Sequence, residues 1–280
     1  MKILYLCNYM LDDVLSVRNN QSTFAQAANN KINQIRSSLE LNGHKVSLLS
    51  SGLVNNKSGK IYKGTKSKLD NDLYYVGIWD LPLLNIISSI VLMTVCISNI
   101  HKKEKIDYIL FWNYKPEVAL AALLCKIFLG VKIIVDYEDG YFSLPNIGRK
   151  RHIFNFVEKV VSKYVDGAIL ISRHLISRIR SKPYYILNGL TNQKVLAFKR
   201  SSSKSKTHPI TLMYAGGLDH ERGIDVLIEA LKYTDKNFVL KISGKGPLGK
   251  MLETGQDSRI QYLGFLNTSN RFNICTNRIY

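Results

Sequence analysis

Three loops in this chain hold residues whose types and spacing could bind or transform a polar ligand. The first is "DYEDGYF", residues 136–142, in which three carboxylates and two tyrosines follow the apolar segment "IIV". Clustered carboxylates at the end of a buried strand can act as a general base or accept hydrogen bonds from substrate hydroxyls. The structural alternative is that Asp136 pairs inside the fold while Glu138 and Asp139 are solvated.

The second loop is "GGLDHERG", residues 216–223, which lies between the β-rich segment "ITLMYA" and a helical pattern. Gly216 and Gly217 would let the backbone approach a ligand closely, with both amides free for it. A helix that begins near Gly223 would point its N–H groups at an anion, with Arg222 beside them. The pattern predicts a phosphate-binding loop. A tight strand-to-helix turn, in which glycine only relieves strain, is the alternative.

The third loop is "SGKGP", with Gly244, Lys245 and Gly246, which again follows a strand pattern and precedes a short helix. Alone it is explained equally well as a structural turn, but two such loops on neighbouring strand–helix units favour a shared ligand. The sequence has no Walker A loop and no G-x-S-x-G motif, and its histidines show no metal-ligand spacing. We therefore expect neither a metal nor a bound cofactor.

The elements that would position these loops alternate along the chain. Strand patterns such as "KILYL", "HKVSLLS", "LYYVGIW" and "IDYILFW" are interleaved with helical patterns, and the polar region 52–72 is expected to be a surface loop. Such alternation predicts an α/β fold with parallel sheets. "RSSSKSKTHP", residues 200–209, has no large apolar residue and predicts a linker. We expect an N-terminal Rossmann-like domain over 1–199 and a partial second one over 210–280.

Composition narrows the class of partner. The net charge of +18 on 280 residues favours phosphates, nucleic acid or an anionic membrane, although codon usage in an AT-rich genome would also enrich lysine. The start, "MKILYLCNYM", is typical of a first strand rather than a signal peptide. The four cysteines form no close pair, which indicates a reducing cytoplasm.

One apolar segment, "LPLLNIISSIVLMTVCISNI" over 81–100, is long enough to suggest a membrane span. Asn85, Ser88 and Ser89 give it a polar face, and the basic "HKKEK" follows directly. We expect a helix that is buried or touches a membrane surface without crossing it.

Taken together, the motifs resemble a known family. "YAGGLDHERGIDVLIEAL", "VLKISGKGPLGKMLE" and "IQYLGFL" look like the second domain of the retaining glycosyltransferases of family four. "KILYL", "LELNGHKVSLLS", "VKIIVDYED" and "YYILNGL" follow the family's order in the first half. The resemblance covers nearly the whole chain and implies a GT-B fold, with two Rossmann-like domains.

The resemblance also implies an activity and its residues. The family transfers a sugar from a nucleotide-diphosphate donor with retention, usually without a metal. Donor diphosphate would lie at Gly216, Gly217, Arg222 and Gly223, where the family commonly has two cations, and Gly244, Lys245 and Gly246 would lie near the nucleotide. Glu138 stands where many members carry a histidine, and Asp139 would face the acceptor.

The end of the chain departs from the family. Further strands, a paired-glutamate segment for the donor and a C-terminal helix would be expected after "LGFL", and their place is taken by "NRFNICTNRIY". We therefore expect a C-terminal truncation that leaves activity uncertain. The favoured interpretation is a cytoplasmic transferase at the inner membrane face that acts on a lipid-linked saccharide in surface polysaccharide assembly. The alternatives are an inactive remnant of such an enzyme and a basic nucleic-acid-binding protein, and the sequence names neither the sugar nor the linkage.

Overall fold

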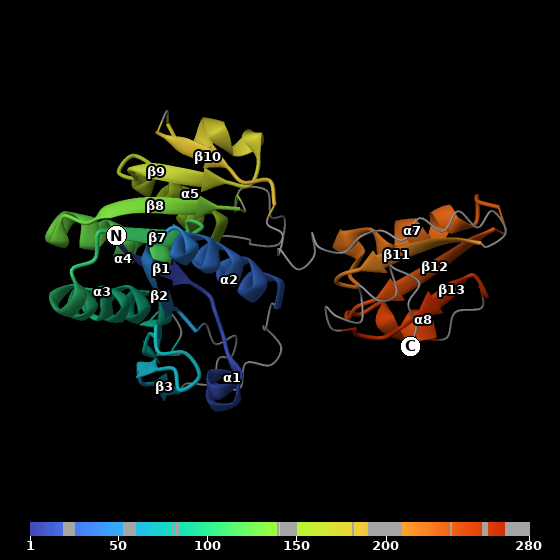
Figure 1. Cartoon of the computed structure of the whole chain (residues 1–280), viewed down its shortest axis with the longest axis horizontal. Coiled ribbons are helices and arrows are strands. Elements are labelled where there is room, and N and C mark those ends of the chain that lie inside the picture. Colours follow the sequence, from blue (N-terminus) through green and yellow to red (C-terminus); the bar gives the residue numbers. More distant parts are fainter. Residues whose placement is uncertain are drawn as a thin grey trace. The chain divides into compact units, whose positions relative to one another are not determined.

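The computed structural model describes residues 1–18, 26–52, 60–79, 81, 84–138, 140, 150–180, 182–189, 209–235, 237–253 and 257–266. The chain divides into two compact units, Met1–Val195 and Leu196–Tyr280 (Figure 1). The predicted linker, 200–209, falls outside the described residues except for Pro209.

The first unit is built on an eight-stranded sheet with the order β10-β9-β8-β7-β1-β2-β5-β4 (Figure 1). Every described neighbouring pair is parallel except β4–β5. The strands are β1 (Lys2–Cys7), β2 (Lys45–Ser50), β4 (Thr65–Lys66), β5 (Leu73–Tyr75), β7 (Tyr108–Trp112), β8 (Lys132–Tyr137), β9 (Gly167–Leu170) and β10 (Tyr184–Ile186). The α/β prediction is confirmed.

Helices cover both faces of this sheet, and the alternation of side chains along β1 shows how. Leu4 and Leu6 belong to the core that includes α4, whereas Ile3 and Tyr5 belong to the core that includes α2. A parallel strand that is buried on both faces reads as a continuous apolar run, as "ILYL" does. The helical elements are α1 (Asp12–Arg18), α2 (Gln26–Leu41), α3 (Leu84–Glu104), α4 (Pro116–Leu129), α5 (Lys150–Val161) and the 3₁₀ segment η4 (Arg173–Arg178).

Helix α4 is apolar on most sides because it packs on β7 and β8 and has α3 and α5 as neighbours. It begins at Pro116, whose fixed φ suits a first turn, and it ends at Gly130, which has φ 71° and donates its N–H to the Lys126 carbonyl. Helix α3 packs beside α4, and the stripe of α3 that is buried consists of Ser89, Met93, Ile97 and Ile100, three of which share a core with Leu4 and Leu6 of β1.

Two sequence predictions near the β4 edge of the sheet are wrong in detail. "LYYVGIW" is two strands, β5 and β6 (Ile78–Trp79), because β5 pairs with β2 and β4 whereas β6 pairs with another strand, outside the large sheet. The region 52–72 is not only a loop, since it contains β4 and also β3 (Ile61–Tyr62), which pairs antiparallel with β6. Strands of two residues are too short to show the apolar alternation that marks a strand.

The second unit, as far as residues 209–266 are described, has a three-stranded parallel sheet with the order β11-β12-β13. The helix predicted to begin near Gly223 is confirmed, and its apolar residues share one face: Ile224 and Leu231 are buried, and Leu227 and Ile228 pack against the same core. The elements are β11 (Ile210–Ala215), the 3₁₀ segment η5 (His220–Arg222), α7 (Ile224–Leu231), β12 (Phe238–Ser243), α8 (Gly249–Glu253) and β13 (Ile260–Tyr262).

Candidate functional sites at the carboxyl ends of the strands

The first unit gathers a charged cluster where β7 and β8 end. These strands are parallel neighbours with Trp112 opposite Asp136, so Trp112, Asp136 and Glu138 share one edge of the sheet. Lys31, from α2, places its Nζ 2.9 Å from both carboxylate oxygens of Asp136 and forms a second ion pair with Glu138. One cation therefore serves two carboxylates that the sequence placed in a single loop.

Neutral donors complete the cluster. Trp112 Nε1 donates to Glu138 Oε2 at 2.6 Å, and the Glu138 N–H donates to Asn113 Oδ1 at 2.8 Å. Tyr5, on β1, donates its hydroxyl to Asp136 Oδ2 at 2.5 Å. Both oxygens of each carboxylate are thus engaged, which fixes the side chains before any ligand arrives.

Burial separates the two carboxylates. The Asp136 side chain is 2% exposed and that of Glu138 is 17% exposed. Burial raises the pKa of Asp136 above its ordinary value, although the Lys31 ammonium and the Tyr5 hydroxyl oppose that rise. Asp136 therefore fits the structural role that the sequence left open, whereas Glu138 is partly exposed and shares the charge of Lys31 with Asp136. Asp139 lies outside the described residues.

Lys31 is the member of the cluster that sequence reasoning missed. It lies 105 positions before Asp136, in a helix whose pattern carries no motif. Only the register of α2 against the sheet brings it to the carboxyl edge, and that register is a tertiary property.

The second unit brings the two glycine loops side by side. Leu218 donates its N–H to the Lys245 carbonyl at 3.0 Å, and Leu248 donates to the Leu218 carbonyl at 3.1 Å. Gly216 also donates its N–H, to the Ser243 carbonyl at 3.0 Å. The prediction that the Gly216 amide is free for a ligand is therefore wrong, because this amide extends the pairing of β11 with β12.

The glycines of these loops serve different purposes. A Cβ on Gly244 would lie 1.9 Å from the Gly216 carbonyl oxygen, and one on Gly246 would lie 2.5 Å from that of Leu218. These two glycines are required because the loop backbones touch. A Cβ on Gly217 would instead meet two side chains and no backbone: the movable carboxylate of Asp219 at 2.9 Å and Arg222 Cγ at 3.9 Å. Gly223, with φ 68°, joins η5 to α7 in a left-handed conformation.

The N-terminus of α7 already carries a negative charge. The carboxylate of Asp225, in the first turn, lies 3.0 Å from His220 Nδ1. This hydrogen bond and one to the Val226 amide hold the pKa of Asp225 below its ordinary value. Arg222, in η5, is an exposed cation next to this helix end, and Lys245, in the neighbouring glycine loop, is also exposed. An anionic ligand at the helix end would gain from Arg222 and compete with Asp225.

Among the described residues, no group of three or more His, Cys, Asp or Glu side chains is arranged to hold a metal ion. Within the same residues, one helix, Leu84–Glu104, is long and apolar enough to cross a membrane. Its most apolar 18-residue window has a mean hydropathy of 1.6, and 17% of that window is buried.

Comparison with known proteins gives a fold and a distant relative. No protein-family model matches the chain. A protein named as an uncharacterised glycosyltransferase of Methanocaldococcus jannaschii is 25% identical over 155 residues, which are 55% of this chain and 41% of that protein. The chain therefore spans less than half the length of this relative.

Solved structures agree on the fold at low sequence identity. Sucrose-phosphate synthase from Thermosynechococcus elongatus has a TM-score of 0.63 at 13% identity, over 95% of this chain and 71% of that one. A lipopolysaccharide outer core galactosyltransferase has a TM-score of 0.58 at 15% identity, and the match covers 99% of this chain and 72% of that one. The catalytic domain of starch synthase IV from Arabidopsis thaliana has a TM-score of 0.53 at 10% identity, and the match covers 98% of this chain and 76% of that one. The chain has an α/β fold of the GT-B type, that of these glycosyltransferases.

Proposed function

We propose that the protein is a glycosyltransferase that moves a sugar from a nucleotide-diphosphate sugar to a saccharide acceptor. The observation that carries the proposal is the pair of hydrogen-bonded glycine loops at the ends of β11 and β12, with Arg222 and Lys245 exposed on them. The archaeal relative that is named a glycosyltransferase supports it, as does the starch synthase of the same fold, which was solved with ADP.

The donor diphosphate would lie against Gly216, Gly217, Arg222 and Gly223. Gly217 leaves room near Arg222, whose Cγ is 3.9 Å from the position of a Cβ on Gly217. A guanidinium can bind two phosphate oxygens at once and neutralise the charge that develops on the leaving diphosphate. Gly244, Lys245 and Gly246 would lie near the nucleotide. Transfer with retention and without a metal is part of the proposal.

The acceptor would be bound by the first unit. Glu138 would face it, oriented by Lys31 and Trp112, and Asp139 would lie beside Glu138 in the chain. A carboxylate that is ion-paired with a lysine suits acceptance of a hydrogen bond from a sugar hydroxyl more than rapid exchange of a proton. We propose a lipid-linked saccharide as acceptor, in surface polysaccharide assembly at the inner membrane face, because of the basic charge and the apolar helix α3.

Calorimetry with UDP, GDP and ADP, and with the matching nucleotide sugars, tests the donor site. We expect one diphosphate to bind and Arg222→Ala to weaken it by about 10- to 100-fold, because hydrogen bonds to charged groups contribute roughly 1.5–3 kcal/mol. Lys232→Ala is the matched control, since Lys232 is an exposed cation at the other end of α7, paired with Glu229. Equal effects of the two substitutions would reject the site.

The transfer itself needs its own measurement. Nucleotide sugars that bind are incubated with lipid-linked saccharides, and the anomeric configuration of the product is read by proton NMR. An inverted product would reject retention while leaving the donor site intact. Binding of a nucleotide sugar without transfer to any saccharide acceptor or to water would reject the transferase proposal.

A further inference from the structure

A groove of about 560 Å³ lies between the C-terminal half of α3 and the strands β3, β4, β5 and β6. Its helix wall includes Leu92, Val95 and Cys96, and its strand wall includes Tyr62 and Tyr74. The volume is within the range of roughly 300–1,000 Å³ that is usual for small-molecule sites. The lining is mainly hydrocarbon and aromatic.

The exposed face of α3 continues this apolar surface. Leu84, Ile87, Val91 and Val95 are 44–60% exposed and follow one another at three- and four-residue spacing, so they form one stripe. The stripe meets the groove at Val95, which belongs to both. Four large apolar side chains in a row on an exposed helix face favour an apolar environment, which the described residues of the unit do not supply.

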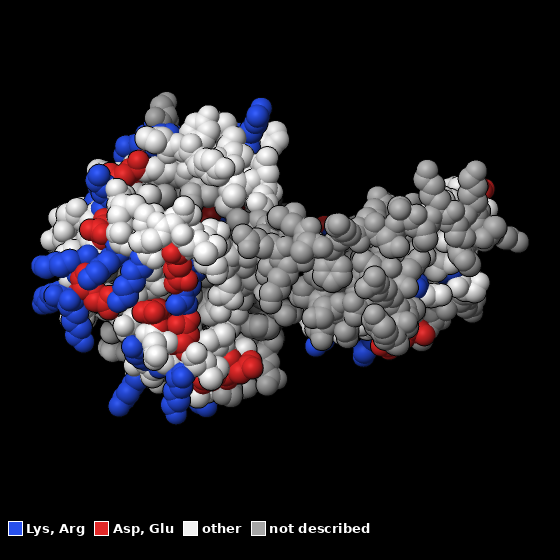
Figure 2. Space-filling model, in the orientation of Figure 1, with Lys and Arg blue, Asp and Glu red and all other residues white. Residues whose placement is uncertain are grey.

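Lysines surround the groove on both walls. Lys63 and Lys66 line it from the β3–β4 segment, and Lys103 lines it from the end of α3. The one carboxylate among the described residues of its lining, Glu104, is paired with Lys45 at 2.6 Å. Figure 2 shows Lys and Arg side chains gathered over the part of the first unit where Figure 1 places α3 and β3. The rim therefore attracts anions, whereas the interior attracts hydrocarbon.

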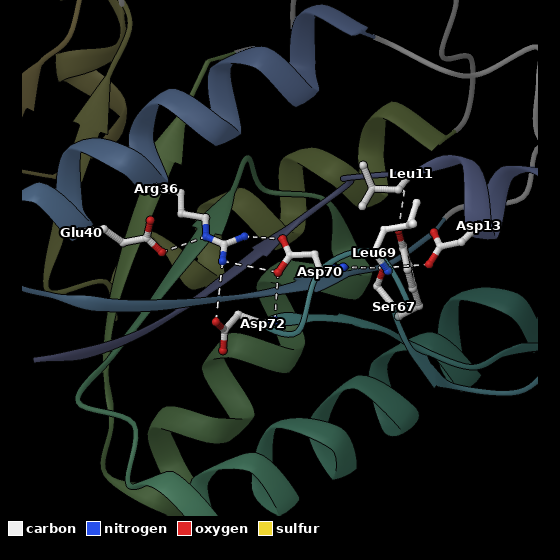
Figure 3. A network of polar contacts seen from close by, with 9 residues as sticks. Leu11, Asp13, Arg36, Glu40, Ser67, Leu69, Asp70 and Asp72 are labelled. Atoms are coloured by element: carbon white, nitrogen blue, oxygen red, sulfur yellow. Dashed lines mark hydrogen bonds and ion pairs between the residues drawn. The ribbon is translucent and has the colours of Figure 1, made fainter.

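The strand wall is held by polar contacts that do not depend on a ligand (Figure 3). Arg36, on α2, is ion-paired with Asp70 and Glu40 and lies 3.8 Å from Asp72. Asp13, on α1, accepts hydrogen bonds from the Ser67 hydroxyl at 2.7 Å and from the Lys68 amide at 3.0 Å. These contacts fix the segment between β4 and β5, so the groove is preformed.

The groove is separate from the charged cluster of Lys31, Asp136 and Glu138. β5 and β8 are four strand spacings apart in the sheet, with β2, β1 and β7 between them. At roughly 4.8 Å per spacing this is about 19 Å. A ligand in the groove would thus not occupy the place of a sugar at Glu138.

We propose that this groove binds one hydrocarbon chain of an anionic membrane lipid, whose phosphate lies against Lys63, Lys66 and Lys103, while the stripe from Leu84 to Val95 contacts neighbouring chains. The inference deepens the membrane part of the proposed function and rests on that part alone. Loss of sugar transfer would leave it standing, and loss of lipid binding would leave the donor site standing.

Cys96 provides a direct probe because it lines the groove and is partly buried, which raises the pKa of its thiol. In a Cys275→Ser background, dodecyl phosphate is expected to protect Cys96 from N-ethylmaleimide. Inorganic phosphate should give no protection, and the neutral amphiphile dodecyl maltoside should protect at least tenfold less well. Shortening the alkyl phosphate by two carbons should weaken binding about tenfold, as expected for a buried chain.

Two substitutions on the same helix form a matched pair. Val95→Trp narrows the groove and should weaken dodecyl phosphate binding at least tenfold, whereas Ile87→Trp, on the stripe but outside the groove lining, should leave it unchanged. The triple change Lys63→Gln, Lys66→Gln and Lys103→Gln should abolish binding to phosphatidylglycerol vesicles, with phosphatidylcholine vesicles as the neutral control. Circular dichroism and thermal unfolding check that each variant is folded.

Three results would overturn the proposal. One is equal protection by inorganic phosphate and dodecyl phosphate, which would indicate a simple anion site. Another is equal protection by dodecyl maltoside, which would remove the role of the lysines. The last is binding to anionic vesicles that Val95→Trp leaves unchanged in a folded protein.

Discussion

Replacing Lys31 by methionine would show what holds the carboxyl edge of the first sheet together. Methionine keeps most of the hydrocarbon stem, so the change removes mainly the ammonium that lies 2.9 Å from both oxygens of Asp136. Breaking one partner of a buried ion pair costs roughly 3–5 kcal/mol, because the other charge stays buried. The Lys31 side chain is 21% exposed, so water recovers part of this. We expect a loss of about 2–3 kcal/mol of unfolding free energy at pH 7.

The loss should depend on pH with a definite sign. Without Lys31, burial would raise the pKa of Asp136 further in the folded state, while its unfolded pKa stays ordinary. An acid with a raised folded pKa destabilises the fold above its unfolded pKa and ceases to do so as the pH falls. The difference between wild type and Lys31→Met should therefore shrink between pH 7 and pH 4.

Urea unfolding followed by tryptophan fluorescence measures this in the first unit alone, because both tryptophans of the chain, Trp79 and Trp112, belong to it. Lys126→Met is the control, since Lys126 pairs with Asp166 at 2.6 Å with both side chains about 30% exposed, and should cost at most about 1 kcal/mol. Asp136→Asn combined with Lys31→Met closes a double-mutant cycle, with an expected coupling above ~1 kcal/mol. A Lys31→Met loss below that of Lys126→Met, or one that is equal at pH 4 and pH 7, would refute the reasoning.

Three further substitutions test other features. Gly244→Ala must separate the glycine loops by about 1.5 Å, because its Cβ would lie 1.9 Å from the Gly216 carbonyl oxygen and ordinary contact begins near 3.4 Å. It should lower the unfolding free energy of the second unit, measured by calorimetry, by roughly 1–3 kcal/mol, whereas Gly217→Ala should change that free energy by less than about 0.5 kcal/mol. Equal losses for the two variants would contradict the packing argument. Burial raises the pKa of Glu158 despite Arg178 at 3.4 Å, so wild type should gain unfolding free energy relative to Glu158→Gln as the pH falls from 7 to 4, and a constant difference in urea titrations would contradict this. Asp225→Asn removes the charge at the start of α7 and should strengthen binding of a nucleoside diphosphate about two- to fivefold by calorimetry, while weaker binding would place the phosphate elsewhere.

The sequence was sufficient for the features that depend on local patterns. Strands β1, β7 and β8 are apolar runs because they are buried on both faces of the sheet. Helix α7 has a 3.6-residue apolar pattern because it is buried on one face. In both cases burial determines the residue types, so the sequence predicts the element. The strands β3 and β4 were missed because they are two residues each and are held by pairing with β6 and β5 rather than by an apolar pattern.

The candidate sites were predictable in part, for a related reason. Loop composition marked Glu138 and the two glycine loops, since ligand groups collect at the carboxyl ends of parallel strands. It could not show that Lys31 pairs with Glu138, nor that the Gly216 amide is used inside the sheet. Both depend on which segment lies opposite in space. The reason why residues 244 and 246 are glycines could not be predicted either. A glycine that is required by backbone contact and a glycine that lets the backbone approach a ligand cannot be told apart in a single sequence.

A common feature of the two sites bears on how a ligand could bind. Glu138 is already paired with Lys31 and bonded to Trp112, and the first turn of α7 already holds Asp225 against His220. Internal partners of this kind keep polar groups in place without a ligand, and they also set a cost, because an incoming hydroxyl or phosphate must replace a contact that exists. The free energy of binding therefore includes only the difference between the new hydrogen bonds and those that they replace. Affinity at each site should depend mainly on groups that a ligand can reach: the exposed guanidinium of Arg222, the open position at Gly217 and the partly exposed carboxylate of Glu138.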